Sequence, residues 1–129
     1  MKWHKKLSVG NDKLDEDHQT LFKITDRYLK ESSDRDREYT TTVLAQLTYY
    51  AKRHFKREED YMEEIGFPGL DKHRDAHDQM NAQLMKLIDR NDACEANVQA
   101  DVADFLANLW IKHIRVDDKR YKDFANSHK

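Results

Sequence analysis

Hydrophobic residues recur along the chain at intervals of three and four positions, the spacing that places side chains on one face of an α-helix. Residues 70–87 show the pattern most clearly, because six inward-facing candidates follow one another at steps of 3, 4, 3, 4 and 3: Leu70, His73, His77, Met80, Leu84 and Leu87. A stripe of this kind packs against a neighbouring helix. Similar stripes predict four helices, over about residues 11–33, 36–65, 70–90 and 95–116.

Glycine and proline are scarce, and several of them lie where the predicted helices end. The 129 residues include 3 glycines and 1 proline, which leaves little material for turns and strands. Asn11 or Asp12 can cap the first helix, and Gly66 with Pro68 can stop the second. Four amphipathic helices with short links predict one all-α domain over residues 1–129. We expect an up-down-up-down four-helix bundle with an N-terminal arm over residues 1–10 and a short C-terminal tail.

The composition excludes several classes of function. Basic residues are interleaved with acidic ones and the net charge is −2, so the chain lacks the basic stripe of a nucleic-acid-binding surface. A single cysteine, Cys94, cannot make an internal disulfide. No apolar run approaches the roughly 18 residues of a membrane span, and the first residues lack the apolar core of a signal peptide. We therefore expect a soluble, cytoplasmic protein.

The stripes carry polar residues at positions where apolar ones would pack. Each predicted helix places at least one histidine on its inward face, and the second adds a carboxylate: His18, His54, Glu58, His73, His77 and His113. An uncompensated buried polar group costs a few kcal/mol, and an unpaired carboxylate costs more. Six such groups would exceed the net stability of a domain of this size, about 5–15 kcal/mol. Mutual hydrogen bonds could satisfy one or two of them, whereas a metal could satisfy all.

The types of ligand narrow the metal chemistry. Five histidines and a carboxylate are too many for one tetrahedral zinc ion, and they fit two ions that share bridging ligands. The Glu-x-x-His motifs of ferritin-like centres are absent. The pairs His54/Glu58 and His73/His77 are each four residues apart, so each pair lies on one helix face and can chelate one ion or flank two. A histidine-rich site suits iron that holds dioxygen without consuming a substrate.

The residues around these histidines resemble the bacterial hemerythrin family over about residues 3–124. One signature from each predicted helix carries the resemblance: residues 14–22 (Leu-Asp-Glu-Asp-His-Gln-Thr-Leu-Phe), 54–59 (His-Phe-Lys-Arg-Glu-Glu), 73–77 (His-x-x-x-His) and 110–118 (Trp-Ile-Lys-His-Ile-x-x-x-Asp). Residues 3–10 resemble the family's N-terminal arm, while Asp17 stands where glutamine is common. The resemblance implies a four-helix bundle with a non-haem di-iron site.

The resemblance also implies a set of ligands. One iron would be held by His73, His77 and His113, and the other by His18 and His54. Glu58 and Asp118 would bridge the two irons, together with a solvent-derived oxo or hydroxo ligand. The iron with two histidines would keep an open position at which dioxygen binds.

An apolar pocket around that open position is implied as well. By position it would comprise Leu21, Phe55, Leu109, Trp110 and Ile114. Such a pocket would exclude water and protons from the bound oxygen. Core packing alone explains Leu21 and Leu109 equally well.

Helix geometry by itself does not select Asp118 as the second bridge. Asp117 lies four residues after His113 and would share its face on a straight helix, whereas Asp118 lies five residues after it and would point about 140° away. We therefore expect the fourth helix to end or distort between Val116 and Asp118, and Asp117 is the rival ligand.

Four functions are open to such a chain. The resemblance favours reversible dioxygen binding by a carrier, store or delivery protein, with no catalytic residues, and we predict this function. One alternative is an oxygen or redox sensor that acts on a partner protein. Another is an enzyme with peroxidase or nitric-oxide-handling activity at the open iron, and the last is an inert bundle that binds zinc.

Overall fold

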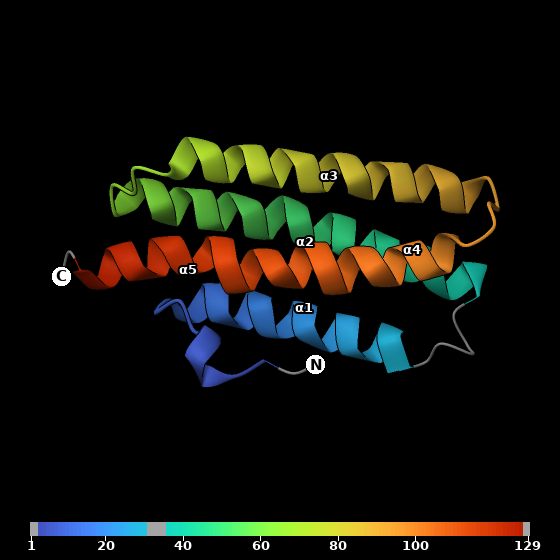
Figure 1. Ribbon diagram of the computed structural model, residues 1–129, viewed down its shortest axis with the longest axis horizontal. Helices are drawn as coiled ribbons and strands as arrows, with labels where there is room; N and C mark the ends of the chain where they lie inside the picture. Colours follow the sequence, from blue (N-terminus) through green and yellow to red (C-terminus); the bar gives the residue numbers. More distant parts are fainter. Residues whose placement is uncertain (1–2, 31–35, 128–129) are drawn as a thin grey trace.

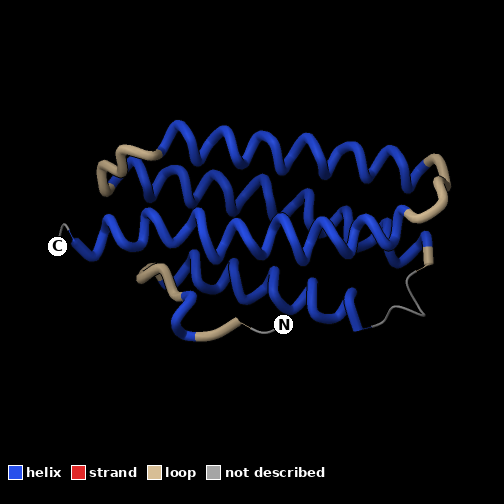
Figure 2. The backbone as a smooth tube through the Cα atoms, viewed as in Figure 1, coloured by secondary structure: helices blue, strands red, loops and turns tan. Residues whose placement is uncertain are grey.

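The computed structural model describes residues 3–30 and 36–127, and it confirms the four-helix bundle (Figure 1). Three long helices are α1 (Asp12–Lys30), α2 (Arg37–Glu64) and α3 (Leu70–Asp92). The fourth rod, residues 98–127, consists of α4 (Val98–Asp104), a π-helical turn (Phe105–Trp110) and α5 (Ile111–Ser127). The described residues contain helices and loops but no strand (Figure 2).

The helix ends agree with the sequence signals at most positions. Asn11 accepts a hydrogen bond from the Leu14 amide at the start of α1, and Asp36 caps α2 in the same way. Gly66 follows α2 with a φ of 71°, a left-handed conformation that glycine adopts without strain. The predicted end of the first helix near residue 33 lies outside the described residues.

The fourth rod is longer than the sequence predicted. It continues to Ser127, whereas the predicted helix ends near residue 116 and is followed by a short tail. The additional turns are held by Tyr121, whose side chain is fully buried among Val9, Leu14 and Met62. Lys122 also donates a hydrogen bond to the Lys6 carbonyl, which ties the N-terminal arm to this end of the rod.

Two apolar clusters form the core, and a polar layer separates them. The larger cluster takes side chains from all four rods, and the smaller one comprises Val9, Leu14, Met62 and Tyr121. Each rod changes from one cluster to the other across a polar residue: His18 between Leu14 and Leu21, Glu58 between Phe55 and Met62, His77 between Leu70 and Met80, and Asp118 between Ile114 and Tyr121. These polar residues therefore meet inside the bundle at one level.

The π-helical turn sets the direction in which the second half of the fourth rod faces. Buried residues of this rod recur every four positions: Val102, Leu106, Trp110, Ile114 and Asp118. On a regular α-helix Asp118 would point about 160° away from Val102 after these 16 residues. In the wide turn the Ile111 amide bonds to the Leu106 carbonyl five residues back, so the turn accommodates about one additional residue. This reduces the angle between Val102 and Asp118. All five side chains can therefore face the interior.

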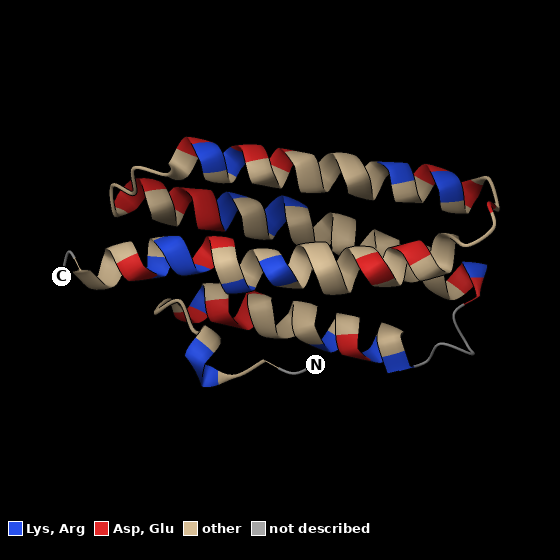
Figure 3. Cartoon of the chain, viewed as in Figure 1, with Lys and Arg blue, Asp and Glu red and all other residues tan. Residues whose placement is uncertain are grey.

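The outer faces of the rods carry lysine, arginine, aspartate and glutamate side by side (Figure 3). This mixture agrees with the near-neutral net charge of −2. None of the helices in the described ranges combines the length and the hydropathy that a bilayer span requires.

Shortening the π-helical turn tests its role in the register of the fourth rod. Deletion of Asn108, an exposed residue of the turn, should remove the one residue that the turn accommodates and restore regular α-helix, so residues 111–127 keep their direction. Ile114, Asp118 and Tyr121 would then stay in the interior, and the free energy of unfolding should stay within about 1 kcal/mol of that of the parent protein.

Chemical denaturation followed by circular dichroism measures this change. The control is deletion of Arg115, an exposed residue of the regular helix α5, which should rotate residues 116–127 by about 100° and lower the free energy of unfolding by more than about 3 kcal/mol. Equal stability of the two deletion variants would contradict the proposed role of the turn.

Candidate metal centre

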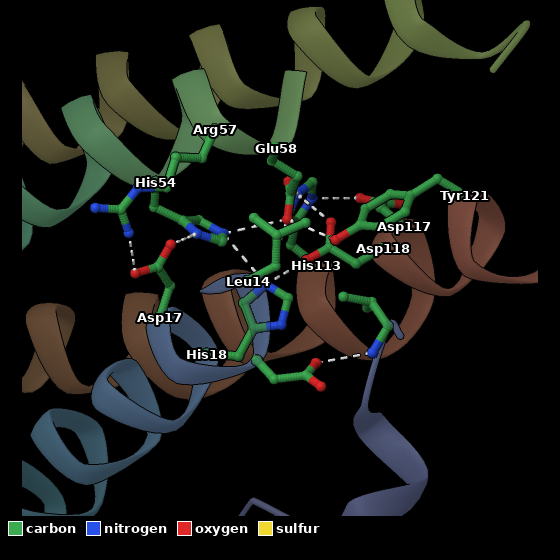
Figure 4. A network of polar contacts seen from close by, with 12 residues as sticks. Leu14, Asp17, His18, His54, Arg57, Glu58, His113, Asp117, Asp118 and Tyr121 are labelled. Carbon is green, nitrogen blue, oxygen red and sulfur yellow. Dashed lines mark hydrogen bonds and ion pairs between the residues drawn. The ribbon is translucent and has the colours of Figure 1, made fainter. Parts of the chain in front are cut away.

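The seven residues predicted as ligands all lie in the polar layer, and all are at least 95% buried. They come from every rod: His18 on α1, His54 and Glu58 on α2, His73 and His77 on α3, and His113 and Asp118 on α5. Figure 4 shows several of these side chains pointing toward one another from three sides of the bundle. The donor atoms form two groups that could each hold a metal ion and that share both carboxylates.

The first group contains three histidines. The Nε2 atom of His73 lies 3.0 Å from Oε1 of Glu58 and 2.9 Å from Oδ1 of Asp118. His77 places its Nε2 atom 2.8 Å from the same Glu58 oxygen, and His113 places its own 3.2 Å from the same Asp118 oxygen. Three imidazole nitrogens and two carboxylate oxygens therefore surround one point.

The second group contains two histidines and uses the other oxygen of each carboxylate. The Nε2 atom of His18 lies 3.3 Å from Oε2 of Glu58 and 3.1 Å from Oδ2 of Asp118. His54 places its Nε2 atom 3.1 Å from the same Glu58 oxygen. Each carboxylate thus presents one oxygen to each histidine group, which is the arrangement of a ligand that bridges two ions.

The distances between nitrogens agree with coordination of a shared ion. The Nε2 atoms of His18 and His54 are 3.2 Å apart, and those of His77 and His113 are also 3.2 Å apart. Nitrogen ligands lie about 2.0–2.1 Å from a divalent ion, so two that meet it at right angles are about 3 Å apart. The histidine donors therefore already have the spacing of ligands on one ion.

Several buried polar atoms of the layer lack a hydrogen-bond partner. Both carboxylate oxygens of Asp118 and Nδ1 of His18 are in this state. A buried acceptor without a donor costs about 1–3 kcal/mol, and an ionised one costs more. Imidazole nitrogens lie 2.9–3.2 Å from the Asp118 oxygens without forming hydrogen bonds to them, so the donor set fits metal ions better than a network of protons.

The electrostatics of the layer point the same way. Burial lowers the pKa of His18, but the Asp118 and Glu58 carboxylates outweigh it and raise that pKa to about 10. Burial likewise lowers the pKa of His73, and the same carboxylates raise it to about 9. Conversely, burial raises the pKa of Glu58, but the surrounding imidazoles, His54 foremost, hold it well below its usual range. Without metal ions, protons on the imidazoles must balance the two carboxylates.

Carboxylates outside the layer bind the outward nitrogens of three imidazoles. The Nδ1–H groups donate to acidic side chains at 2.8–2.9 Å in three pairs: His54 to Asp17, His77 to Glu59, and His113 to Asp117. Asp17 is held in turn by Arg57 at 2.7 Å, as Figure 4 shows. A proton fixed on Nδ1 leaves the Nε2 lone pair free for a metal.

Sequence reasoning missed these supporting residues. Asp17 stood out only as a departure from the family pattern, and Glu59 only as the last residue of the signature over residues 54–59. Tyr121, whose hydroxyl donates to Oε2 of Glu58 at 3.0 Å, was not singled out at all. Its signal was its position three residues after Asp118 on the same helix face.

The structure places Asp118 in the centre and Asp117 at its rim. The central stripe of α5 contains Ile111, Ile114, Asp118 and Tyr121. His113 lies at the edge of that stripe and reaches the centre with its long side chain, while Asp117 is 32% exposed and bonds to its outward nitrogen. The expected distortion between Val116 and Asp118 is absent, because α5 is regular there and the wide turn lies upstream.

The predicted apolar pocket is only partly assembled as expected. Leu21, Phe55, Trp110 and Ile114 are buried in the larger cluster. Phe55 stacks on the ring of His77 at 3.8 Å between centroids and lies 5.7 Å from the ring of Trp110. Leu109, by contrast, is only partly buried and lines surface cavities, so it belongs to the margin of this wall.

Comparisons with known proteins find relatives over nearly the whole chain. The family model described as "Hemerythrin HHE cation binding domain" matches residues 9–125. A bacteriohemerythrin from Clostridium acetobutylicum is 31% identical over 94% of this chain and 98% of that protein. Another, from Stenotrophomonas maltophilia, is 25% identical over 98% of this chain and 82% of that protein. A crystal structure of wild-type hemerythrin superposes with a TM-score of 0.83, at 26% identity over 95% of each chain.

Two substitutions separate the roles of the neighbouring aspartates. Asp118→Asn removes a charged oxygen from each donor group, and we expect it to lower the bound metal by at least half. Asp117→Asn removes only the outer partner of His113, so metal should still bind, with an affinity about 10–100-fold lower. Elemental analysis after equilibration with ferrous iron measures both. The reverse order of effects would make Asp117 the ligand.

The pKa shifts predict how the stability of the metal-free protein depends on pH. Stabilisation from the raised pKa values of His18 and His73, about 10 and about 9, is complete below about pH 6.5 and is lost as the pH rises through 9–10. Stabilisation from the lowered pKa values of Glu58 and Asp118 is lost as the pH falls below about 4.5. The free energy of unfolding should therefore be greatest near about pH 5–6.

Denaturant titrations at constant ionic strength measure this profile. The metal-loaded protein is the control, because metal ions replace the protons and should remove the decline between about pH 6.5 and 10. Metal-free protein that gains stability over that interval would contradict the assignment.

Proposed function

This chain belongs to the hemerythrin family, and we propose that it holds two iron ions and binds dioxygen reversibly as a carrier, store or delivery protein. The family match and a histidine and carboxylate cluster that could hold metal support a non-haem iron protein that binds oxygen. One observation carries the proposal further. Glu58 and Asp118 each direct one oxygen to the three-histidine group and the other to the two-histidine group.

The unequal number of histidines supports an open position on one ion. With both carboxylates shared, the group that contains His18 and His54 supplies one protein ligand fewer than the other. When bound, the iron pair would supply the electrons and the vacant coordination position to which dioxygen attaches. The side chains of this chain then determine what reaches that position.

The surroundings favour binding over consumption of the oxygen. On one side the polar layer borders the larger apolar cluster, where Phe55, Trp110 and Ile114 are each at least 96% buried. Apolar walls keep water and protons from a reduced oxygen species and so slow its loss. The hydroxyl of Tyr121, which reaches the layer, already donates its proton to a hydrogen bond with Glu58. We propose no catalytic residue and a cytoplasmic location.

Oxygen cycling with a metal count tests this function. Purified, air-exposed protein should contain about two irons per chain and should change its visible absorption reversibly when oxygen is removed and restored. His54→Ala should lose iron or oxygen binding, because it takes one of two histidines from the open ion. His4→Ala, which alters an exposed histidine of the arm, is the matched control and should behave like the parent.

The outcomes distinguish the competing functions. Colourless protein that contains zinc would overturn the proposal in favour of an inert bundle. Oxidation of the irons within minutes of exposure to air would favour a sensor or an enzyme. Normal oxygen binding by His54→Ala would show that the ligand assignment is wrong.

A further inference from the structure

The outward nitrogens of the five inward-facing imidazoles are not all satisfied in the same way. Three of them donate to carboxylates of the chain, at Asp17, Glu59 and Asp117. The Nδ1 atom of His18 is enclosed in the interior. His73 differs from the other four, because its Nε2 atom points to Glu58 and its ring lines a surface cavity, while Nδ1 has no hydrogen-bond partner among the described residues.

This cavity lies where the first turns of α3 meet α5, and it has a volume of about 540 Å³. Lys72 and His73 line it from α3, Gly69 lines it from the position just before that helix, and Asp117 and Arg120 line it from α5. His73 is 95% buried and is one of the lining residues, so only a small part of its ring reaches the cavity. Because Nε2 points into the polar layer, we place the other ring nitrogen, Nδ1, on the side of the cavity.

The groups around the cavity favour an anion. Lys72 and Arg120 are exposed at its rim and carry positive charge. The N-terminus of α3 contributes in the same sense, because Gly69 caps this 23-residue helix without a side-chain acceptor and leaves amide groups free. Hydrogen-bond donors therefore line the same cavity as the ring of His73.

The acidic residues nearby cancel only part of this charge. Asp117 lies 3.6 Å from Arg120 and also accepts the hydrogen bond from His113, so it offsets one of the two positive charges at the rim and leaves that of Lys72. Asp71, on the first turn of α3, is 98% exposed and lies 3.6 Å from Arg74. Arg120 keeps further N–H donors after its contact with Asp117, since a guanidinium group has five.

We propose that this cavity binds a small free oxyanion of the class of inorganic phosphate or sulfate. The anion accepts a hydrogen bond from Nδ1–H of His73 and pairs with Lys72 and Arg120. Nδ1 is the outward nitrogen of His73, and the chain's own carboxylates accept the corresponding hydrogen bonds from His54, His77 and His113. The consequence for a bound ion rests on the proposed function, because an acceptor on Nδ1 fixes the ring and makes Nε2 a stronger ligand. Binding of the anion itself does not depend on that function.

Calorimetric titration of the purified protein with sodium sulfate, and separately with phosphate, tests the site. The ionic strength is held constant with sodium chloride, which removes general screening. We expect saturable binding of one anion per chain. Lys72→Gln and Arg120→Gln should each weaken binding at least about threefold, and the double variant about tenfold.

Lys119→Gln is the matched control. It removes the same charge from an exposed position of α5 next to Arg120, but Lys119 does not line the cavity and pairs with Asp123 instead. This variant should bind sulfate within twofold of the parent protein. Binding that fails to saturate, or that Lys119→Gln weakens as much as Lys72→Gln does, would overturn the proposal.

A second readout tests the contact with His73. In the iron-loaded protein, proton magnetic resonance detects the shifted N–H signals of the coordinating imidazoles. One of these signals should shift as sulfate is added, and the titration curve should give the same dissociation constant as calorimetry. Lys72→Gln should raise this dissociation constant by the same factor in both measurements. Anion binding that moves none of them would overturn the His73 contact. If the protein holds no iron, the proposed function fails, yet the calorimetric result still decides whether the anion site exists.

Discussion

The whole bundle is organised around the need to keep five imidazoles and two carboxylates away from water. An interior of this polarity is tolerable only if the charges compensate one another at short range. The polar layer achieves this by placing Glu58 and Asp118 within 3.3 Å of inward-facing nitrogens from every rod. Apolar clusters lie on both sides of the layer, so the geometry of the layer and the packing of the core depend on each other.

The fourth rod shows how strongly this constraint acts on the backbone. A regular α-helix would satisfy more of its own hydrogen bonds, yet residues 105–110 adopt a π-helical turn. The turn allows the apolar stripe that begins at Val102 to continue through Ile114 and to end in the polar layer at Asp118. The loss of hydrogen bonding is confined to residues 105–110, whereas the resulting helix direction serves both the packing of the core and the placement of the metal ligands.

The sequence predicted the rods and the inward histidines well because both depend on helical periodicity, which is a local property. His18, His73 and His77 lie four or three residues from apolar neighbours on the same stripe, and the structure places all three inside. Asp118 was harder to place, because its direction depends on a wide turn eight residues upstream, at Trp110 and before. Asp117 was judged correctly as a neighbour of His113, but it bonds to the outward nitrogen instead of the inward one.

The supporting acids show why the ligands are already aligned. Three units of histidine, carboxylate and arginine surround the layer: His54, Asp17 and Arg57; His77, Glu59 and Arg74; His113, Asp117 and Arg120. None of these contacts involves an inward-facing nitrogen, so they orient the rings whether or not an ion is bound, and the entropy of ordering them is lost during folding. His73 is the ligand without such a unit on its accessible side. Its orientation depends on its α3 backbone, on Glu58 and Asp118, and on whatever occupies the cavity beside Lys72. His73 thus contrasts with the three histidines that have such units, and its outward side is where we propose that an oxyanion from solution acts on the centre.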